Sequence, residues 1–442
     1  MRNMTKPIIA ALLMLFLSAD MRAQNVADDY VPTAENLRSR QEFENMRFGI
    51  FIHWGLYATF AQGEWYMQNA PVNREEYAKT ARGFYPARFS AHDWVAAIKA
   101  SGAGYICITT RHHDGFSMWG TKQTPYNIVD ATPFGRDILK ELSEECRKQG
   151  IRLHLYYSHL DWYREDYPMG RTGRNVGKDP NKADWQSYFN FMNAQLTELL
   201  TDYGPIGAIW FDGWWDHDSD ATPFNWHLPE QYALIHRLQP ACLIGNNHHM
   251  AINAGEDIQI FEKDLPGENK MGFVEAAATI GKLPLETCET MNGMWGFKIT
   301  DQNYKSTDEL IRYLVTTAGK GANLLMNIGP QPDGELPDIA VQRLKELGQW
   351  MSTHGETIKG TTAGDVPTQT WGSTTRKGKR LFVHILNYKQ QELLLPMTKK
   401  VIKAQTFDGK KKVKVTKTQT GVVLTLPEVP SGADYIVELT TD

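Results

Sequence analysis

The sequence of 442 residues predicts an α/β protein, a (β/α)₈-like TIM barrel followed by a small C-terminal antiparallel β-sandwich. Strand-like apolar runs alternate with helix-like segments between residues 48 and 351, and several runs are apolar on both faces, as buried parallel strands are. Near Gly360 the pattern changes to short strands separated by turns. We therefore expect three regions: a signal peptide at 1–23, a barrel domain at 24–356 and a β-sandwich at 357–442.

The barrel strands are predicted where short apolar runs end in polar or aromatic residues, as strands do at the open face of such a barrel. These runs lie at 48–53, 104–110, 151–158, 206–211, 242–246, 258–261 and 321–328. Seven or eight strands of this kind favour a closed barrel. A doubly wound sheet is the main competing fold, but it predicts a glycine-rich phosphate loop after the first strand, and the sequence has none there.

Segments with apolar residues at helical spacing separate most of these runs. Ser306 and Glu309 form a capping-box pattern at the start of one segment, and Gly150 is placed to end another. The predicted helices lie at 91–101, 137–149, 184–203, 229–239, 306–318 and 340–351.

The C-terminal region carries short strand-like runs at 381–386, 392–395, 411–415, 422–426 and 435–439. A lysine-rich stretch within it is typical of a solvated strand edge that prevents aggregation, and contact with an acidic glycan is the alternative. Its lysines are Lys410, Lys411, Lys412, Lys414 and Lys417.

The N-terminus has the features of a secretory signal. Arg2 and Lys6 precede an apolar run at 8–17 that is too short to span a bilayer, and a cleavage junction follows at Ala23. We therefore expect an exported protein, periplasmic or secreted, without membrane insertion. A buried N-terminal helix is the alternative.

Charge and cysteine content narrow the functional classes. The chain has 47 Lys and Arg against 51 Asp and Glu, which argues against a nucleic-acid partner or a charge-driven role at a membrane surface. The four cysteines are widely spaced and form no CxxC pair, so we expect neither a zinc site nor a disulfide framework. Buried free thiols are predicted at Cys107, Cys146, Cys242 and Cys288.

Asp212 is the strongest candidate for chemistry. It directly follows the apolar run 208–211 and is therefore expected at the mouth of the barrel. Tryptophans at 210, 214 and 215 flank it, and a carboxylate in such an apolar setting costs free energy unless it is hydrogen-bonded or used. The alternative is a carboxylate that caps a helix or pairs with an arginine.

Cleavage of a glycosidic bond with retention needs a second carboxyl group about 5–5.5 Å from the first. Glu262 follows the run 258–261 as Asp212 follows its own, and Ile260 and Phe261 are expected to raise its pKa by desolvation. A surface ion pair is the alternative role for Glu262. Other acidic candidates downstream are Glu256, Asp257, Asp264, Glu268, Glu286 and Glu289.

His53, His112 and His113 also follow strand-like runs, and neutral imidazoles suit sugar hydroxyls because each ring both donates and accepts. A second interpretation is a metal-dependent barrel hydrolase that uses these histidines with His248 and Asp212 as ligands. Against it, no His-x-His pattern follows the first strand. A third interpretation is an inactive sugar-binding protein, which the two candidate carboxylates argue against.

Six motifs resemble, in their order, those of the α-L-fucosidases of glycoside hydrolase family 29 over most of residues 47–330: FIHWG, GEWY, RHHDGF, YYSHLDW, IWFDGWW and ETCETMNGMWGF. The resemblance implies a (β/α)₈-like barrel with a C-terminal β-sandwich, and an exo-acting enzyme that retains configuration without a metal or cofactor. The implied substrate is a fucosylated oligosaccharide or glycoconjugate. The IWFDGWW form is more similar to the broad-specificity branch of the family.

By position in these motifs, Asp212 would be the nucleophile and Glu262 the acid/base, with Glu286 as the alternative. Trp295 would lie near the C5 methyl group of fucose, where apolar contact is worth on the order of 1 kcal/mol. Many relatives carry an arginine where this chain has His248. The expected substrate contact at this position is therefore a titratable ring and not an always-charged guanidinium. The other implied substrate contacts are His53, Glu64, Trp65, His112, His113, Tyr156 and Trp210.

Overall fold

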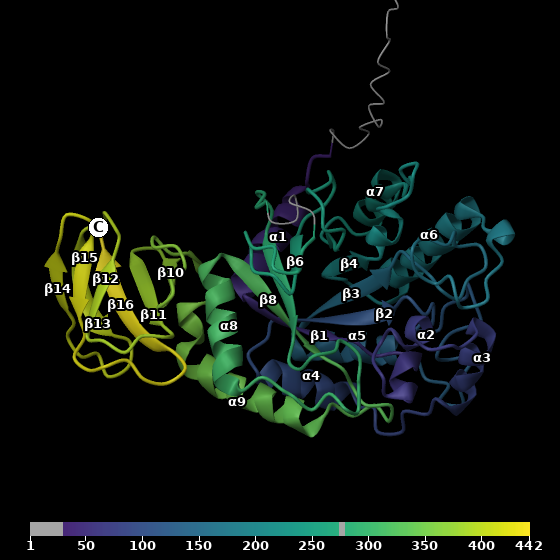
Figure 1. The fold of residues 1–442 in the computed structure, drawn as a ribbon, viewed down its shortest axis with the longest axis horizontal. Coiled ribbons are helices and arrows are strands. Elements are labelled where there is room, and N and C mark those ends of the chain that lie inside the picture. Colours follow the sequence, from purple (N-terminus) through teal and green to yellow (C-terminus); the bar gives the residue numbers. More distant parts are fainter. Residues whose placement is uncertain (1–29, 274–278) are drawn as a thin grey trace, which may run out of the picture.

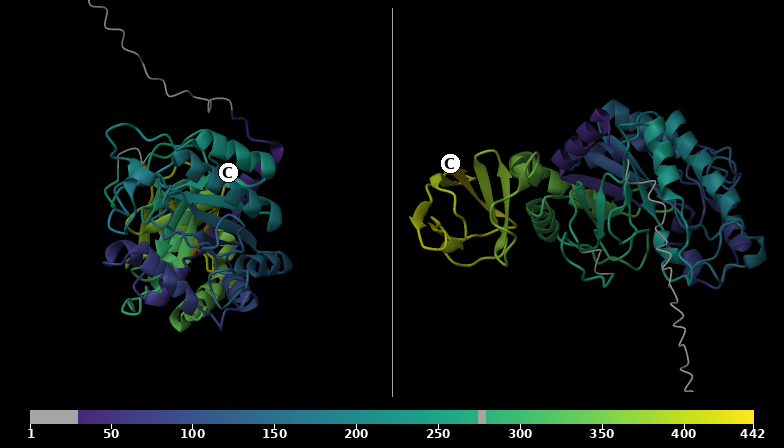
Figure 2. Two further views of the ribbon diagram at one scale, coloured as in Figure 1. Left: turned by 90° about the vertical axis from the view of Figure 1, so that its right-hand side faces the viewer. Right: turned by 90° about the horizontal axis from the view of Figure 1, so that it is seen from above.

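The computed structural model describes residues 30–273 and 279–442. The predicted signal peptide lies outside the described residues. The chain forms a barrel followed by a β-sandwich, which lies at the left in Figure 1 and at one end of the molecule when seen from above in Figure 2. None of the helices in the described ranges has the length and apolar character needed to cross a bilayer.

Eight parallel strands form the barrel sheet, in the order β5-β4-β3-β2-β1-β8-β7-β6. At the remaining junction, between β5 and β6, the described residues make one isolated parallel bridge, Gly245 to Ile258. We call this junction the seam. The fold predicted from the sequence is confirmed as a nearly closed barrel. Its strands are β1 (Phe48–Ile52), β2 (Tyr105–Arg111), β3 (Arg152–Ser158), β4 (Ala208–Asp212), β5 (Leu243–Asn246), β6 (Gln259–Glu262), β7 (Leu285–Thr290) and β8 (Ala322–Ile328).

Helices pack around this sheet, but in the described part of the chain none lies between β5 and β6 or between β6 and β7. The six predicted helices are present, each with boundaries within a few residues of those expected. The helices are α1 (Ala34–Met46), α2 (Tyr66–Asn69), α3 (Arg74–Lys79), α4 (Ala91–Ala100), α5 (Ile138–Gln149), α6 (Trp185–Asp202), α7 (Leu228–Leu238), α8 (Thr307–Gly319) and α9 (Asp338–His354).

Helix α1, which the sequence reading missed, supports the seam. Arg40 on α1 donates to Oδ1 of Asp257 at 2.6 Å, and Oδ2 of Asp257 accepts the backbone N–H of Ile244 on β5 at 2.8 Å. Asp257 directly precedes Ile258, the residue that bridges to β5. A buried carboxylate thus links strand and helix where the regular ladder is interrupted.

The barrel interior is filled by packed side chains, as in other barrels of this type. The inward-facing cluster includes Phe51, Tyr105, Trp210, Leu243 and Leu325, all buried. The four cysteines are buried and free, as predicted.

The C-terminal domain has a five-stranded sheet, β13-β16-β11-β10-β9, and a three-stranded sheet, β12-β15-β14. Leu381, Val383, Leu395, Leu424 and Val437 pack between them. Strand β14 is an edge of its sheet, and its Lys414 and Lys417 are exposed, as the solvated-edge interpretation expects. The strands are β9 (Thr362–Ala363), β10 (Gly372–Lys377), β11 (Arg380–Ile385), β12 (Glu392–Leu395), β13 (Val401–Thr406), β14 (Lys414–Lys417), β15 (Val422–Thr425) and β16 (Tyr435–Thr441).

Candidate active site

A cavity of about 300 Å³ opens at the carboxyl ends of the barrel strands. Nine residues singled out in the sequence line it: His53, Trp65, His112, His113, Tyr156, Trp210, Asp212, Glu262 and Trp295. Trp215, noted in the sequence only as a neighbour of Asp212, also lines it, as do six residues that were not singled out: Phe51, Arg171, Asn247, His249, Met271 and Phe273. Glu64, His248 and Glu286 do not line the cavity.

Asp212 ends β4 and is only 9% exposed, yet its carboxylate is well supplied with hydrogen-bond donors. Oδ2 accepts the hydroxyl of Tyr156 at 2.9 Å. Oδ1 accepts the indole N–H of Trp215 at 3.0 Å and the backbone N–H of Gly213 at 2.8 Å. Burial, followed by the negative charge of Glu262, raises the pKa of Asp212, while Trp215 and Tyr156 oppose the shift. The carboxylate is therefore held in place and is largely shielded from bulk solvent.

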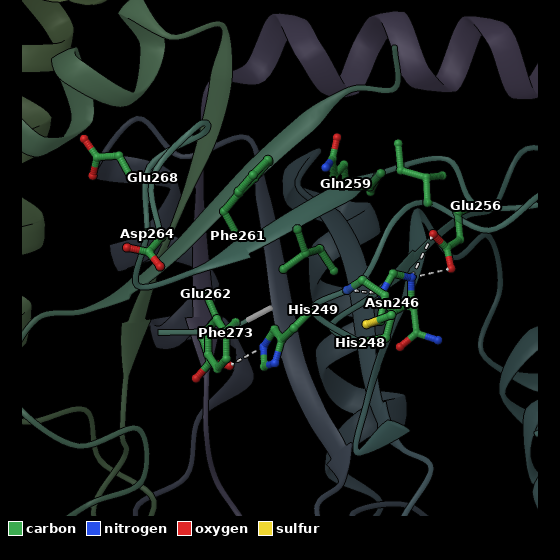
Figure 3. Close-up of a pocket in the computed structure, with 14 residues that line it drawn as sticks. Asn246, His248, His249, Glu256, Gln259, Phe261, Glu262, Asp264, Glu268 and Phe273 are labelled. Carbon is green, nitrogen blue, oxygen red and sulfur yellow. Dashed lines mark hydrogen bonds and ion pairs between the residues drawn. The ribbon is translucent and has the colours of Figure 1, made fainter. Parts of the chain in front are cut away.

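Glu262 ends β6 and faces the same cavity. Its Oε2 accepts from the side-chain amide of Asn247 at 2.8 Å. The same oxygen lies 3.2 Å from Nε2 of His249, a contact drawn in Figure 3. Burial acts to raise the pKa of Glu262, but the hydrogen bonds and the charge of these neighbours outweigh it, and the pKa is lowered. The expectation of a raised pKa is therefore wrong, because the sequence reading counted Phe261 and Ile260 but missed His249.

The consecutive histidines 248 and 249 point to different neighbours (Figure 3). Nε2 of His248 lies 3.0 Å from Oε1 of the buried Glu256, away from the cavity. His249 has a left-handed backbone, with φ of 58°, and its ring stacks on Phe273 at a centroid distance of 3.6 Å. His249 therefore occupies the place beside Glu262, and the structure does not bring His248 into the cavity.

Three buried imidazoles form one wall of the cavity. Nδ1 of His53 lies 2.6 Å from Oδ1 of Asn327, and Nδ1 of His113 lies 2.7 Å from Oγ of Ser158. Burial lowers the pKa of His53 to about 3 and holds the pKa of His112 and His113 well below the usual range. The rings are therefore neutral at physiological pH and can both donate and accept hydrogen bonds.

Aromatic rings supply the remaining surface. Trp65 and Trp215 stack at a centroid distance of 5.7 Å, and Trp295 lies 5.1 Å from the ring of His53. The guanidinium of Arg171 lies over Trp215 at 5.2 Å. Flat apolar faces beside neutral polar groups suit a sugar, which has both kinds of surface.

Glu286 and Glu64 support the cavity from behind. Glu286 is fully buried in the barrel and accepts from Tyr105 at 2.5 Å and from the indole N–H of Trp210 at 2.9 Å. Burial raises its pKa to about 7. Glu64 accepts the backbone N–H of Gly296 at 2.8 Å, next to Trp295. Both carboxyl groups position cavity residues without lining the cavity themselves.

Residues 17–356 match the sequence model of a family described as alpha-L-fucosidase. The chain belongs to the α-L-fucosidase family. It is 30% identical to the plasma α-L-fucosidase of Rattus norvegicus over 398 residues, covering 83% of this chain and 79% of that protein. It is 27% identical to the α-L-fucosidase of Dictyostelium discoideum, covering 96% of each chain. The family resemblance drawn from the six motifs is confirmed.

Solved α-L-fucosidase structures share the fold. α-L-Fucosidase isoenzyme 1 from Paenibacillus thiaminolyticus superposes with a TM-score of 0.81 and 31% identity, covering 92% of this chain and all of that one. A family 29 enzyme from Bacteroides thetaiotaomicron, trapped as a covalent intermediate in complex with 2-fluoro-fucosyl fluoride, gives a TM-score of 0.78 at 25% identity, covering 92% and 96%. This α-L-fucosidase family member is a glycoside hydrolase.

Within the described residues of this α-L-fucosidase, His, Cys, Asp and Glu side chains do not gather in groups of three or more that could hold a metal ion. Of the histidines considered as metal ligands in the sequence, His53 instead contacts Asn327 and His113 contacts Ser158. The second interpretation of the sequence, a metal-dependent hydrolase, was based on these histidines together with His248, which lies elsewhere.

Proposed function

We propose that this α-L-fucosidase removes terminal α-L-fucose from fucosylated glycans by double displacement, with Asp212 as the nucleophile and Glu262 as the acid/base. One observation carries the proposal. The amide nitrogen of Asn247 lies 3.3 Å from Oδ1 of Asp212 and 2.8 Å from Oε2 of Glu262, so these oxygens are at most about 6 Å apart. Inverting glycosidases need about 6.5–9.5 Å between their carboxyl groups, and retaining ones about 5–5.5 Å.

In the first step, Oδ2 of Asp212 attacks the anomeric carbon. Oδ1 accepts hydrogen bonds from Gly213, Trp215 and Asn247, which favours attack by the other oxygen. Protonated Glu262 gives its proton to the leaving oxygen from Oε1, which accepts no hydrogen bond from any described residue. The product is a fucosyl ester of Asp212, formed with inversion at the anomeric carbon.

In the second step, ionised Glu262 removes a proton from water, which attacks the anomeric carbon and breaks the ester bond to Asp212. A second inversion restores the original configuration. The negative charge returns to Asp212 and the proton to Glu262. The lowered pKa of Glu262 favours the ionised form that this step requires and disfavours the protonated form that the first step requires.

The side chains that line the cavity suit a terminal α-L-fucose. The neutral imidazoles of His53, His112 and His113 suit hydroxyl groups, and the ring of Trp295 supplies apolar surface for the C5 methyl group. The buried Trp210 forms the floor, because its indole is tied to Glu286 beneath it. A closed floor fits an exo-acting enzyme that takes the terminal fucose. The outer residues Arg171, Met271 and Phe273 are left to contact the rest of the glycan.

We also propose that the protein is exported and has two domains after its signal peptide. We assign 1–23 to a cleaved signal peptide, 24–356 to the catalytic barrel and 357–442 to the sandwich. The protein would then act in the periplasm or outside the cell, where fucosylated glycans reach it. Fractionation of cells that produce the full chain, with mass determination of the mature N-terminus, tests the assignment.

Azide rescue tests the two catalytic roles. Asp212→Gly is expected to lose nearly all activity on an aryl α-L-fucoside, and azide should then give the inverted fucosyl azide. Glu262→Ala should still cleave a fucoside with a good leaving group, and azide should accelerate it and give the retained product. Glu286→Ala is the matched control. If azide rescues that variant while Glu262→Ala keeps full activity on natural glycans, the acid/base assignment is wrong.

A further inference from the structure

The side-chain amide of Asn247 contacts both candidate catalytic carboxylates. Nδ2 donates to Oε2 of Glu262 at 2.8 Å and to Oδ1 of Asp212 at 3.3 Å. The side chain is only 2% exposed and lines the cavity. The backbone N–H of Asn247 donates to Phe211 at 2.8 Å, which fixes the residue against β4. One buried group thus has both hydrogens committed to the two reacting residues.

The orientation of this amide follows from its partners. Ionised carboxylates only accept hydrogen bonds, so the NH₂ group of Asn247 must face Asp212 and Glu262. Its Oδ1 is then buried, without a hydrogen-bond partner among the described residues. A buried acceptor without a donor costs stability. This cost is accepted at a position where the NH₂ group of the same amide donates to both carboxylates.

The position of Asn247 relative to the seam explains why a bridging group is needed. Asp212 is fixed by ladders on both sides of β4. Glu262 is on β6, across the seam from β5, and the described residues there make the single bridge Gly245 to Ile258. Among the described residues, regular backbone pairing therefore holds Glu262 through Cys288 on β7 but not on the side that faces β5. Asn247, which follows β5, reaches across to Glu262.

We propose that Asn247 is a positioning residue that sets the separation of Asp212 and Glu262 and selects the oxygen that each presents to the sugar. The inference rests on the catalytic roles proposed above for these two carboxylates. By occupying Oδ1 of one and Oε2 of the other, the amide leaves Oδ2 and Oε1 for the reaction. The contact is kept in the fucosyl ester, because Oδ1 becomes its carbonyl oxygen and still accepts.

The pH profile of kcat/KM distinguishes this role from a purely structural one. The amide stabilises the ionised form of both carboxylates, so its removal raises both pKa values. Asp212 must be ionised and Glu262 protonated in the free enzyme, so the acid and alkaline limbs should both move to higher pH. A general loosening of the site would lower the rate without moving both limbs in one direction.

The experiment compares Asn247→Ala with Asn246→Ala. Asn246 is also buried, but its amide donates to Tyr232 at 2.8 Å and contacts neither carboxylate. Asn247→Ala should lower kcat/KM about 10- to 100-fold, the effect of losing hydrogen bonds to charged groups, with both limbs shifted upward. Asn246→Ala should keep the wild-type limbs. Thermal unfolding of each variant measures the effect on the fold.

Asn247→Asp is the second variant and preserves the shape of the side chain. It replaces the donor with a third negative charge, so the limbs should move upward at least as far as in Asn247→Ala. Wild-type limbs in a folded Asn247→Asp or Asn247→Ala would overturn the proposal. Activity retained by Asp212→Gly would instead overturn the proposed catalytic roles, which separates the two failures.

Discussion

The hydroxyl of Tyr156 donates to Oδ2 of Asp212 at 2.9 Å, and the two residues come from adjacent strands of the barrel. The ring of Tyr156 stacks on two neighbouring rings, that of His112 at a centroid distance of 5.3 Å and that of Trp210 at 5.5 Å. The donor is therefore held rigidly at the oxygen that we assign to nucleophilic attack.

Tyr156→Phe should move the acid limb of kcat/KM to higher pH. The hydroxyl favours the ionised form of Asp212, so its removal raises the pKa of Asp212 further, and ionisation is complete only at higher pH. We expect a loss of about 10-fold at the optimum, which corresponds to about 1.4 kcal/mol. Tyr157→Phe is the control, because that hydroxyl donates to Gln195. An unmoved acid limb in Tyr156→Phe would contradict the prediction.

His249→Ala and His248→Ala should behave differently although the residues are adjacent. His249 lowers the pKa of Glu262, so its removal raises that pKa and moves the alkaline limb to higher pH. His248→Ala should keep both limbs but lower the free energy of unfolding by about 1–3 kcal/mol, because the buried Glu256 loses a partner. Equal shifts of the alkaline limb in both variants would contradict the assignment of His249 to Glu262 and of His248 to Glu256.

Glu286→Gln should make stability less dependent on pH. Burial raises the pKa of Glu286 from 4.5 to about 7, so the folded state favours its protonated form. The contribution of this group to the free energy of unfolding is fully present below its unfolded-state pKa of 4.5, and it is lost as pH rises toward the folded-state pKa of about 7. The variant should therefore gain roughly 3 kcal/mol over wild type between pH 5 and pH 8. Unfolding curves of both proteins at the two pH values test this. The prediction is wrong if the difference in unfolding free energy between variant and wild type is the same at pH 5 and pH 8.

Much of the barrel could be predicted because its strands are apolar on both faces. Strand β7 was missed for a physical reason: four of its six residues 285–290 (LETCET) are polar, and Glu286 is buried where Tyr105 and Trp210 donate hydrogen bonds to it inside the barrel. Those partners lie 181 and 76 residues away in the sequence. Helix α1 was missed because its surface is mainly polar, with few buried side chains.

The site was predictable where a residue directly ends an apolar run, as Asp212 and Glu262 do. His249 was not, because a His-His pair carries no indication of which ring faces the cavity. That choice depends on a left-handed backbone at His249 and on stacking against Phe273, which is distant in sequence. A positive φ is uncommon for a residue with a side chain, and sequence gives little warning of it. Asn247 was likewise not predicted, because it lies one residue beyond the predicted strand 242–246 and its contacts are to residues distant in sequence.

The seam between β5 and β6 also bears on how this enzyme can diversify. The connections that follow β5 and β6 contain no helix among the described residues, so changes in their length need not disturb the packing around the barrel. Asp212, by contrast, ends a strand that is paired on both sides, with Asp212 itself paired to Ser158 on β3. Insertions beside the seam can therefore remodel the cavity wall around Glu262 while the strand that ends in Asp212 stays fixed. The incomplete closure of the sheet leaves the Glu262 side of the cavity freer to vary in sequence and length than the Asp212 side.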